Sequence, residues 1–245
     1  MSSSPPPHHR LLPRWAAWPL KGLIAVLITA VCLALIFCET LYAAGARHLP
    51  DALPPTTWQA DAALRRQFLL VEIGNTAPMP RMNPITVWRP LLETATAGES
   101  RPIRRTPSLP SLAARVVGLR MLAQPMSHLS RLLTEQALAI RISREWTTEQ
   151  TIDTILAESH YAQDVRGFEA ASQHFFQRPA GALRPQETLA LIALLKGPSW
   201  YDPVCNRDRF EQRYARLAQE IGGTGPAWSS ATALARLRVR ACTRR

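Results

Sequence analysis

Lysine is nearly absent from this chain of 245 residues, because Lys21 and Lys196 are its only lysines. The formal net charge of +11 at pH 7 is therefore carried almost entirely by arginine. A basic surface predicts an acidic partner, which would be an anionic lipid, a pyrophosphate or a nucleic acid. Arginine enrichment from a GC-rich genome is the alternative explanation of the same charge.

Several motifs that would indicate a function are also missing. The sequence contains no phosphate-binding G-x-x-x-x-G-K-[ST] loop, no zinc-ligand spacing, no Ser/His/Asp constellation and no internal repeat. It has no RNA- or DNA-binding motif and no basic patch interleaved with aromatic residues. We therefore expect no nucleic-acid partner.

An almost wholly apolar run is present near the N-terminus, over residues 20–44. Its length is about the 20 residues that a membrane span requires. Arg10, Arg14 and Lys21 come before or at its start, and the positive-inside rule then keeps the N-terminus in the cytoplasm. We predict a single-pass protein of the inner membrane with a periplasmic C-terminal domain, while cleavage after Ala43-Ala44-Gly45 stays an open alternative.

The predicted organisation follows from this span. The expected parts are a disordered cytoplasmic arm (1–19), a transmembrane helix (20–44), a proline-containing linker (45–56) and one globular domain (57–245). Cys32 and Cys38 fall inside the span and are expected to be plain apolar residues. Cys205 and Cys242 fall in the domain, on the oxidising side, so we predict a disulfide between them, with unpaired thiols as the alternative.

The domain is expected to be mainly helical. Apolar spacing and end signals predict helices over 131–144, from Thr147 to Gly167, over 168–176, 185–196 and 207–221, and a last helix reaching Arg240. Thr147 and Gln150 form a predicted capping box. Pro185 suits a first helical turn, and Gly197 with Pro198 suits a helix end.

A further helix is predicted from a capping box at Thr56 and Gln59 to about Ile73. Its apolar stripe is Ala60, Leu64, Phe68 and Val71, and Glu72 lies at the edge of that stripe, just before Gly74. Burial and the negative end of the helix dipole would both raise the pKa of Glu72, which suits a general base or acid. The alternative is an ordinary last-turn glutamate that points to solvent.

Residues 130–203 resemble the C-terminal half of a family-51 glycosyltransferase domain, the peptidoglycan transglycosylase of class A penicillin-binding proteins and monofunctional transglycosylases. The motif R-K-x-x-E corresponds to Arg131 and Glu135, and the helix LSKDEILELYLN corresponds to WTTEQTIDTILA. The motif G-x-x-A-x-x-Y-F corresponds to Gly167, Ala170 and Phe175-Phe176, P-S-x-Y-D-P to PSWYDP, and the terminal R-x-x-x-V-L to Arg213.

The resemblance implies a lysozyme-like, mainly α-helical transglycosylase domain that elongates glycan chains from lipid II at the outer face of the inner membrane. Glu72 occupies the place of the catalytic glutamate in E-D-x-x-F-x-x-H-x-G. Glu135, Arg131 and Arg213 would hold the pyrophosphate end, with Mg²⁺ or Mn²⁺ as a possible cofactor that Glu135 could bind. Ser111 is the only polar position that matches the substrate-binding motif G-G-S-T-I-T-Q-Q. Surface ion pairing is the alternative for Arg131 and Glu135, and a solvated basic face is the alternative for Arg213.

Several family positions are changed in this chain. Ile73, Thr76, Met79 and Arg81 replace the other letters of the glutamate motif, and Thr148 and Ala157 replace a lysine and an asparagine. A catalytically degenerate homologue that binds and scaffolds other cell-wall synthesis proteins is therefore an alternative. A hydrolase with Glu72 as general acid is a third, and it would need a second carboxylate or a positioned water. The Ser-x-x-Lys motif of a penicillin-binding transpeptidase is absent.

Overall fold

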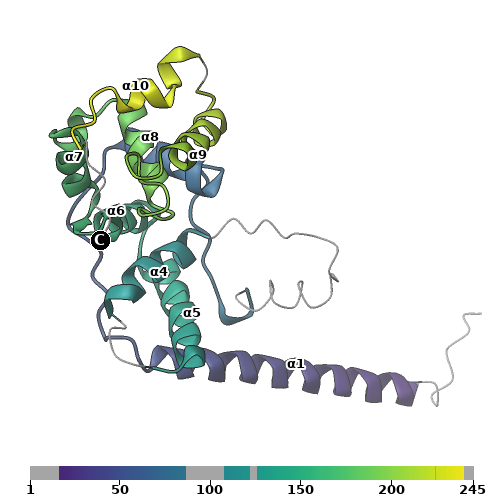
Figure 1. The fold of residues 1–245 in the computed structure, drawn as a ribbon. Coiled ribbons are helices and arrows are strands. Elements are labelled where there is room, and N and C mark those ends of the chain that lie inside the picture. The colour runs from purple at the N-terminus through teal and green to yellow at the C-terminus, as the bar shows by residue number, and fades with distance from the viewer. Residues whose placement is uncertain (1–16, 87–107, 122–125, 224, 240–245) are drawn as a thin grey trace, which may run out of the picture. The chain divides into compact units, whose positions relative to one another are not determined.

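A computed structural model describes residues 17–86, 108–121, 126–223 and 225–239 of the chain. The chain divides into two units, Met1–Leu41 and Tyr42–Arg245. The described residues are mainly helical, with a single two-stranded sheet (Figure 1). The prediction of a mainly α fold is confirmed. The domain boundaries at residues 44 and 56 stay predictions, and most of the expected disordered arm lies outside the described residues.

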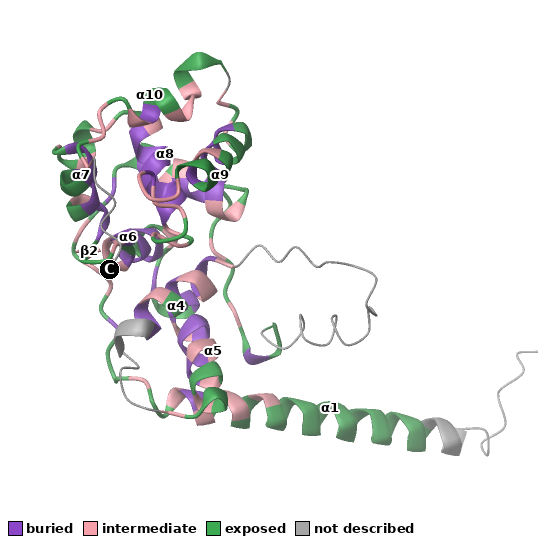
Figure 2. Ribbon diagram, in the orientation of Figure 1, coloured by how far each residue is buried: buried purple, intermediate pink, exposed green. Residues whose placement is uncertain are grey.

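The helix α1 (Ala17–Ala46) carries the apolar run. Within Lys21–Ala46 an 18-residue window reaches a mean hydropathy of 2.5, and in the described part of the chain this is the one helix long and apolar enough to cross a membrane. Large apolar side chains such as Leu27 and Phe37 are exposed along it (Figure 2). A lipid environment would cover such side chains, so α1 is a candidate membrane anchor, and its orientation stays a prediction.

The second unit is built from short helices and one hairpin. In chain order its elements are α2 (Ala62–Phe68), the π-helical turn η2 (Leu69–Ile73), α4 (Leu109–Met121), α5 (His128–Glu145), α6 (Thr148–Glu158), β1 (His160–Ala162), β2 (Val165–Arg166), α7 (Phe168–Phe176), η3 (Ala180–Ala182), α8 (Pro185–Leu194), α9 (Arg207–Glu220), η4 (Pro226–Trp228) and α10 (Ser230–Leu234). α4 packs on α5 and α6.

Helix α8 is the centre of the core. It begins with Pro185 in its first turn, as predicted, and every residue from Glu187 to Leu194 is buried (Figure 2). α2, α7, α9 and α10 contact it from different sides (Figure 1). The buried carboxylate of Glu187 accepts a hydrogen bond from the Arg184 amide at 2.8 Å, which satisfies a free donor at the helix start. α8 therefore sets the positions of the helices around it.

The predicted capping box at Thr147 and Gln150 is confirmed. The Thr147 side chain accepts a hydrogen bond from the Gln150 amide at 3.2 Å, and the Gln150 side chain accepts one from the Thr147 amide at 2.8 Å. α6 therefore begins where the local sequence indicates.

The capping box predicted at Thr56 and Gln59 is wrong. α2 begins later, where Asp61 accepts a hydrogen bond from the Leu64 amide at 2.7 Å. The Thr56 amide instead donates to the hydroxyl of Thr154 in α6 at 3.1 Å. A tertiary contact therefore holds residues before α2 in an extended path, against the local signal.

The helix predicted from Thr147 to Gly167 is also shorter than expected. α6 ends at Glu158, and β1 and β2 form an antiparallel hairpin before α7. Gly167 has φ 88°, and a Cβ there would lie 2.9 Å from the carbonyl oxygen of Ala157. Glycine therefore lets the chain return close to the end of α6 before α7 begins.

Two other helix boundaries differ from prediction. α5 begins at His128, with Ser127 as its N-cap, and therefore starts three residues before the predicted first residue Arg131. The last helix, α10, ends at Leu234 and does not reach Arg240. The Arg238 amide donates to the carbonyl of Phe175 in α7 at 2.8 Å, so the chain runs along α7 in place of a further helical turn.

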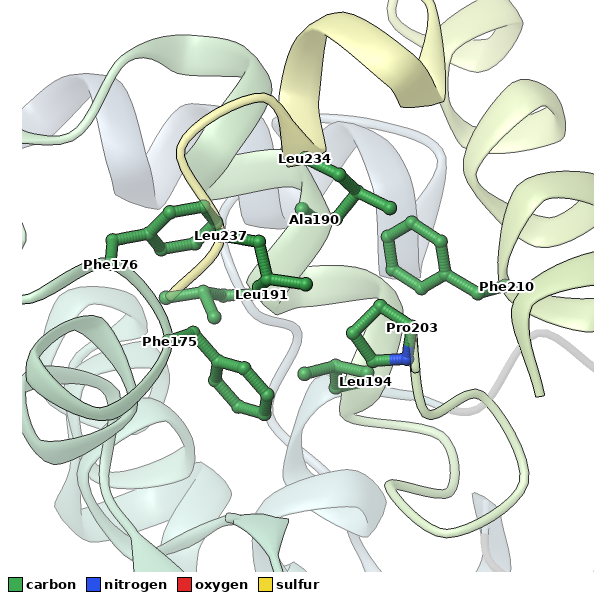
Figure 3. Close-up of a pocket in the computed structure, with 9 residues that line it drawn as sticks. All are labelled: Phe175, Phe176, Ala190, Leu191, Leu194, Pro203, Phe210, Leu234 and Leu237. Atoms are coloured by element: carbon green, nitrogen blue, oxygen red, sulfur yellow. The ribbon is translucent and has the colours of Figure 1, made fainter. Parts of the chain in front are cut away.

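A small apolar cavity of about 10 Å³ lies among α7, α8, α9 and α10 (Figure 3). Leu234 and Leu237 close one side of it, and Phe175, Phe176 and Phe210 form other walls. One water molecule requires about 10–15 Å³ of such volume together with polar partners, and the side chains that line this space are apolar. This space is therefore a packing defect of the core and not a ligand site.

The hydroxyl of Tyr214 is buried without a hydrogen-bond partner among the described residues. Burial raises the pKa of Tyr214 to about 12. Its ring stacks on Phe210, with 5.9 Å between centroids. Tyr214→Phe keeps that stacking and removes the unsatisfied group, so we expect the free energy of unfolding to rise by about 1 kcal/mol.

Thermal unfolding of the detergent-solubilised protein measures this change. Tyr161→Phe is the matched control, because the Tyr161 hydroxyl donates to the Leu156 carbonyl at 3.4 Å and its removal brings no gain. A Tyr214→Phe variant less stable than wild type would contradict the assignment of an unsatisfied hydroxyl.

Candidate active site

Glu72 lies in η2, the wide turn that continues α2. Phe68, which directly precedes this turn, and Val71, which lies within it, are buried in the core. Gly74, with φ 80°, ends it, and the Gly74 amide donates to the Leu69 carbonyl at 3.0 Å. This left-handed end is the one that glycine favours. The Glu72 side chain is 14% exposed, so the alternative of a solvent-pointing glutamate is wrong.

Arg213 of α9 is the direct partner of Glu72. Its Nη2 donates to Glu72 Oε1 at 2.8 Å, and its Nε donates to the Ala193 carbonyl of α8 at 2.8 Å. Its guanidinium carbon lies 5.1 Å from the ring centroid of Tyr201. The side chain is only 9% exposed, so the alternative of a solvated basic face is wrong for Arg213.

The electrostatic balance around Glu72 favours an unusually basic carboxylate. Burial raises the pKa of Glu72, and this effect exceeds the lowering by Arg213 and Lys196. Glu220 of α9 adds to the rise. The pKa of the buried Tyr161 in β1 is raised well above its ordinary value by burial and by the nearby Glu72. Glu72 therefore has the desolvated setting of a proton acceptor, with a cation bonded to it.

Arg131 and Glu135 lie in α5, one turn apart, where Arg131 is exposed and Glu135 is half-buried. Glu135 Oε1 lies 3.6 Å from Nε of Arg115 in α4. Within the described residues no hydrogen bond or ion pair joins Glu135 to Glu72 or Arg213. The two predicted glutamates therefore have different arginine partners, and the roles of Arg131 and Glu135 stay predictions.

Ser111 lies in the first turn of α4, half-buried, and its hydroxyl is 2.8 Å from that of Ser108. Its predicted contact with substrate stays a prediction.

Cys205 lies in the loop before α9, where its amide donates to Oδ1 of Asp202 at 2.7 Å. Cys205 is disulfide-bonded, as predicted. Its predicted partner Cys242 lies outside the described residues, so the pairing with Cys242 stays a prediction.

Sequence reasoning did not single out Lys196, Tyr201 or Arg209. Lys196 follows α8 and lowers the pKa of Glu72 through its charge, and Tyr201 contacts the guanidinium of Arg213. Arg209 lies over the ring of Trp200, with 3.7 Å from its guanidinium carbon to the ring centroid. The signals available were the rarity of lysine and the PSWYDP motif, which contains both aromatic residues.

A divalent cation would have few ligands here. Among the described residues no group of three or more His, Cys, Asp and Glu is placed to hold a metal ion. Glu135 offers a single carboxylate. Mg²⁺ is commonly bound by one or two carboxylates together with substrate phosphates, so this set fits a metal held mainly by substrate.

Comparison with known proteins identifies related sequences. Residues 111–221 match the family model described as Transglycosylase. The chain is 27% identical to penicillin-binding protein 4 of Bacillus subtilis (strain 168) over 96 residues, which are 39% of this chain and 15% of that protein. It is 30% identical to penicillin-binding protein 1A of Rickettsia felis over 110 residues, covering 45% of this chain and 14% of that protein.

Penicillin-binding protein 1B of Vibrio cholerae is similar over a shorter stretch, with 30% identity over 94 residues, or 37% of this chain and 11% of that protein. The chain thus spans about a seventh or less of the length of these relatives. Arg213, Arg131, Glu135 and Ser111 lie within the family match, and Glu72 lies outside it.

Proposed function

We propose that this protein, whose residues 111–221 match the transglycosylase family model, is a membrane-anchored peptidoglycan glycosyltransferase that polymerises lipid II, with Glu72 as the general base. The growing glycan chain is its acceptor or donor partner, and other cell-wall synthesis proteins are further candidate partners. The domain acts on the outer face of the inner membrane, the side to which the positive-inside rule would send it.

One observation carries the assignment of Glu72. Glu72 precedes the matched residues 111–221, yet its carboxylate is bonded to Arg213, which lies near the end of the match. The fold thus joins the one acidic position kept from the glutamate motif to the arginine kept from the terminal motif. A buried carboxylate beside a buried cation is the chemistry that base catalysis on a pyrophosphate-linked sugar needs.

The proposed reaction is a displacement at the anomeric carbon of the donor sugar. Glu72 accepts the proton of the acceptor's sugar 4-hydroxyl as that oxygen forms a bond to the anomeric carbon. The bond from this carbon to the pyrophosphate oxygen breaks, and its electron pair leaves with undecaprenyl pyrophosphate. Arg213, Arg131 and Ser111 hold or position the pyrophosphate and sugar groups, and Glu135 would hold a Mg²⁺ or Mn²⁺ ion, which would stabilise the phosphate charge.

A second candidate is a homologue that binds lipid II without polymerising it. Such a homologue would keep the pair of Arg213 and Glu72 intact when lipid II binds, whereas a polymerase needs Glu72 free to accept a proton. The replaced family positions at Thr148 and Ala157 favour this candidate. The two candidates share the fold and the anchor and differ in catalysis alone.

Polymerisation of fluorescent lipid II by the full-length protein in detergent, with and without Mg²⁺ or Mn²⁺, separates them. We expect glycan chains that a muramidase digests. Retention of lipid II by the immobilised protein without any product would instead support the binding protein. If the protein neither forms glycan chains nor retains lipid II, both candidate functions are excluded.

The pH dependence of polymerisation should follow the ionisation of Glu72. A general base acts when deprotonated, and the pKa of Glu72 is raised by burial. We therefore expect the rate to fall as pH decreases through a pKa above the ordinary 4.5. In Arg213→Lys the single ammonium group should stabilise the Glu72 carboxylate less well than the guanidinium does. The fall in rate at low pH should therefore begin at a higher pH in this variant. Initial rates from pH 4.5 to 8.5 test both points, and a limb that Arg213→Lys leaves in place or moves to lower pH would contradict Arg213 as the tuning cation.

A further inference from the structure

We propose that Arg213 exchanges partners during turnover: it pairs with Glu72 in the free protein and turns to the pyrophosphate group of the bound substrate, which releases Glu72 to act as base. This inference rests on the proposed function. It assigns to Arg213 a control of Glu72 that goes beyond holding the leaving group.

The contacts of Arg213 suit such an exchange. Nε is anchored to the Ala193 carbonyl of α8, and Nη2 bonds to Glu72. Nη1 has no hydrogen-bond partner among the described residues. A guanidinium presents its donors in a rigid fork that matches the oxygens of a phosphate. With Nε fixed, a small rotation can move the outer nitrogens from one anion to another while the side chain stays in place.

The charges around the pair favour an incoming anion. Lys196 is exposed after α8, and Arg209 is exposed on α9 beside the 57%-exposed Trp200. Arg209 lies one turn before Arg213 on α9, and Lys196 follows α8, whose Ala193 carbonyl binds Arg213. The charge of Lys196 also acts on Glu72. Positive charge of this kind attracts a polyvalent anion, which competes with a single carboxylate for the guanidinium.

The exchange would couple binding to basicity. Three charged groups act on Glu72 from the packed elements: Arg213 and Glu220 of α9 and Lys196 after α8. The buried Tyr161 of β1 also lies near enough to Glu72 for the carboxylate to raise the pKa of its hydroxyl. Burial already raises the pKa of Glu72, and Arg213 is the largest opposing effect. Once a pyrophosphate pairs with Arg213, the guanidinium no longer lowers the pKa of Glu72, and the carboxylate accepts a proton more readily. In the free protein Arg213 thus holds the pKa of Glu72 lower than burial alone would, and the substrate makes Glu72 a stronger base.

A double-mutant cycle tests the exchange without any polymerisation. The full-length protein in detergent is titrated with inorganic pyrophosphate and, separately, with farnesyl pyrophosphate, using calorimetry. The four proteins are wild type, Glu72→Gln, Arg213→Gln and the double variant. If Glu72 competes for Arg213, Glu72→Gln binds pyrophosphate about tenfold more tightly than wild type, and this gain disappears when Arg213 is also replaced. Arg209→Gln with and without Glu72→Gln is the control pair, in which the gain should persist.

An equal gain in both Arg213 backgrounds would mean simple repulsion by Glu72 and would overturn the exchange. Absence of pyrophosphate binding by wild type would overturn it as well.

If Arg213→Gln does not fold, Arg213→Lys replaces it in the cycle, and the gain in affinity should shrink because a single ammonium group lacks the forked donors of a guanidinium. A response to farnesyl pyrophosphate alone would assign the site to lipid-linked pyrophosphate, and a response to both would assign it to pyrophosphate itself. If Glu72 and Arg213 are coupled in pyrophosphate binding but no glycan forms, the proposed activity is rejected and the competition for Arg213 is retained. If glycan forms but the two residues are not coupled, the proposed activity is retained and the exchange is rejected.

Discussion

Glu72→Gln should lower the rate of glycan polymerisation by at least about 100-fold, because a positioned general base contributes 100- to 10,000-fold to catalysis. Glutamine keeps the size of the side chain and its carbonyl oxygen can still accept the hydrogen bond from Arg213 Nη2. It cannot accept the proton of a sugar hydroxyl. The variant should therefore stay folded and lose the chemical step, as initial rates with fluorescent lipid II would measure.

Glu220→Gln is the matched control for this variant. Glu220 is exposed on α9 and acts on Glu72 through its charge alone. Removing that charge should change the rate by less than about tenfold, the size of an effect that one unit of pKa would cause. Equal activity in wild type and Glu72→Gln would mean that another group is the base, and Glu135→Gln would then be the next variant.

Asp153→Ala should lower the free energy of unfolding by about 3 kcal/mol, the second large effect that we expect. Oδ1 of Asp153 in α6 accepts hydrogen bonds from the Ala60 amide at 3.2 Å and from Arg65 Nε at 2.9 Å, and Oδ2 accepts from Arg65 Nη2 at 2.6 Å. The Asp153 side chain is 5% exposed and that of Arg65 is 24% exposed. Alanine would leave a buried amide unsatisfied and a guanidinium with only partial access to water.

Asp153 also links α6 to the segment that leads into Glu72. α2 begins directly after the Ala60 amide, and η2 continues α2. Loosening this contact should therefore reduce polymerisation at temperatures where most of the protein is still folded. Glu149→Gln, an exposed change in the first turn of α6, is the control and should cost less than about 1 kcal/mol. Thermal unfolding in detergent measures both, and a loss below about 1 kcal/mol for Asp153→Ala would show that water replaces its hydrogen bonds.

The sequence alone determined the elements whose signals lie within a few residues of each other. The capping box of Thr147 and Gln150, the first-turn Pro185 of α8 and the limits of α7 after Gly167 all follow from short-range contacts. The apolar stripe through Phe68 and Val71 correctly indicated which side of the turn is buried. These features hold because the backbone groups at a helix end are satisfied by neighbours in the chain, whatever packs around them.

Only the tertiary structure decided the pairings. Motif resemblance singled out Glu72 and Arg213 separately, but their bond joins positions 141 residues apart. Glu135 lies beside Arg115 and not in an ion pair with Arg131, its neighbour on the helix. Thr56 is drawn to Thr154, 98 residues away, so its local capping signal fails. In these cases the packing of the helices decides which partner a group finds, because a desolvated charge or donor gains far more from a partner than an exposed one does.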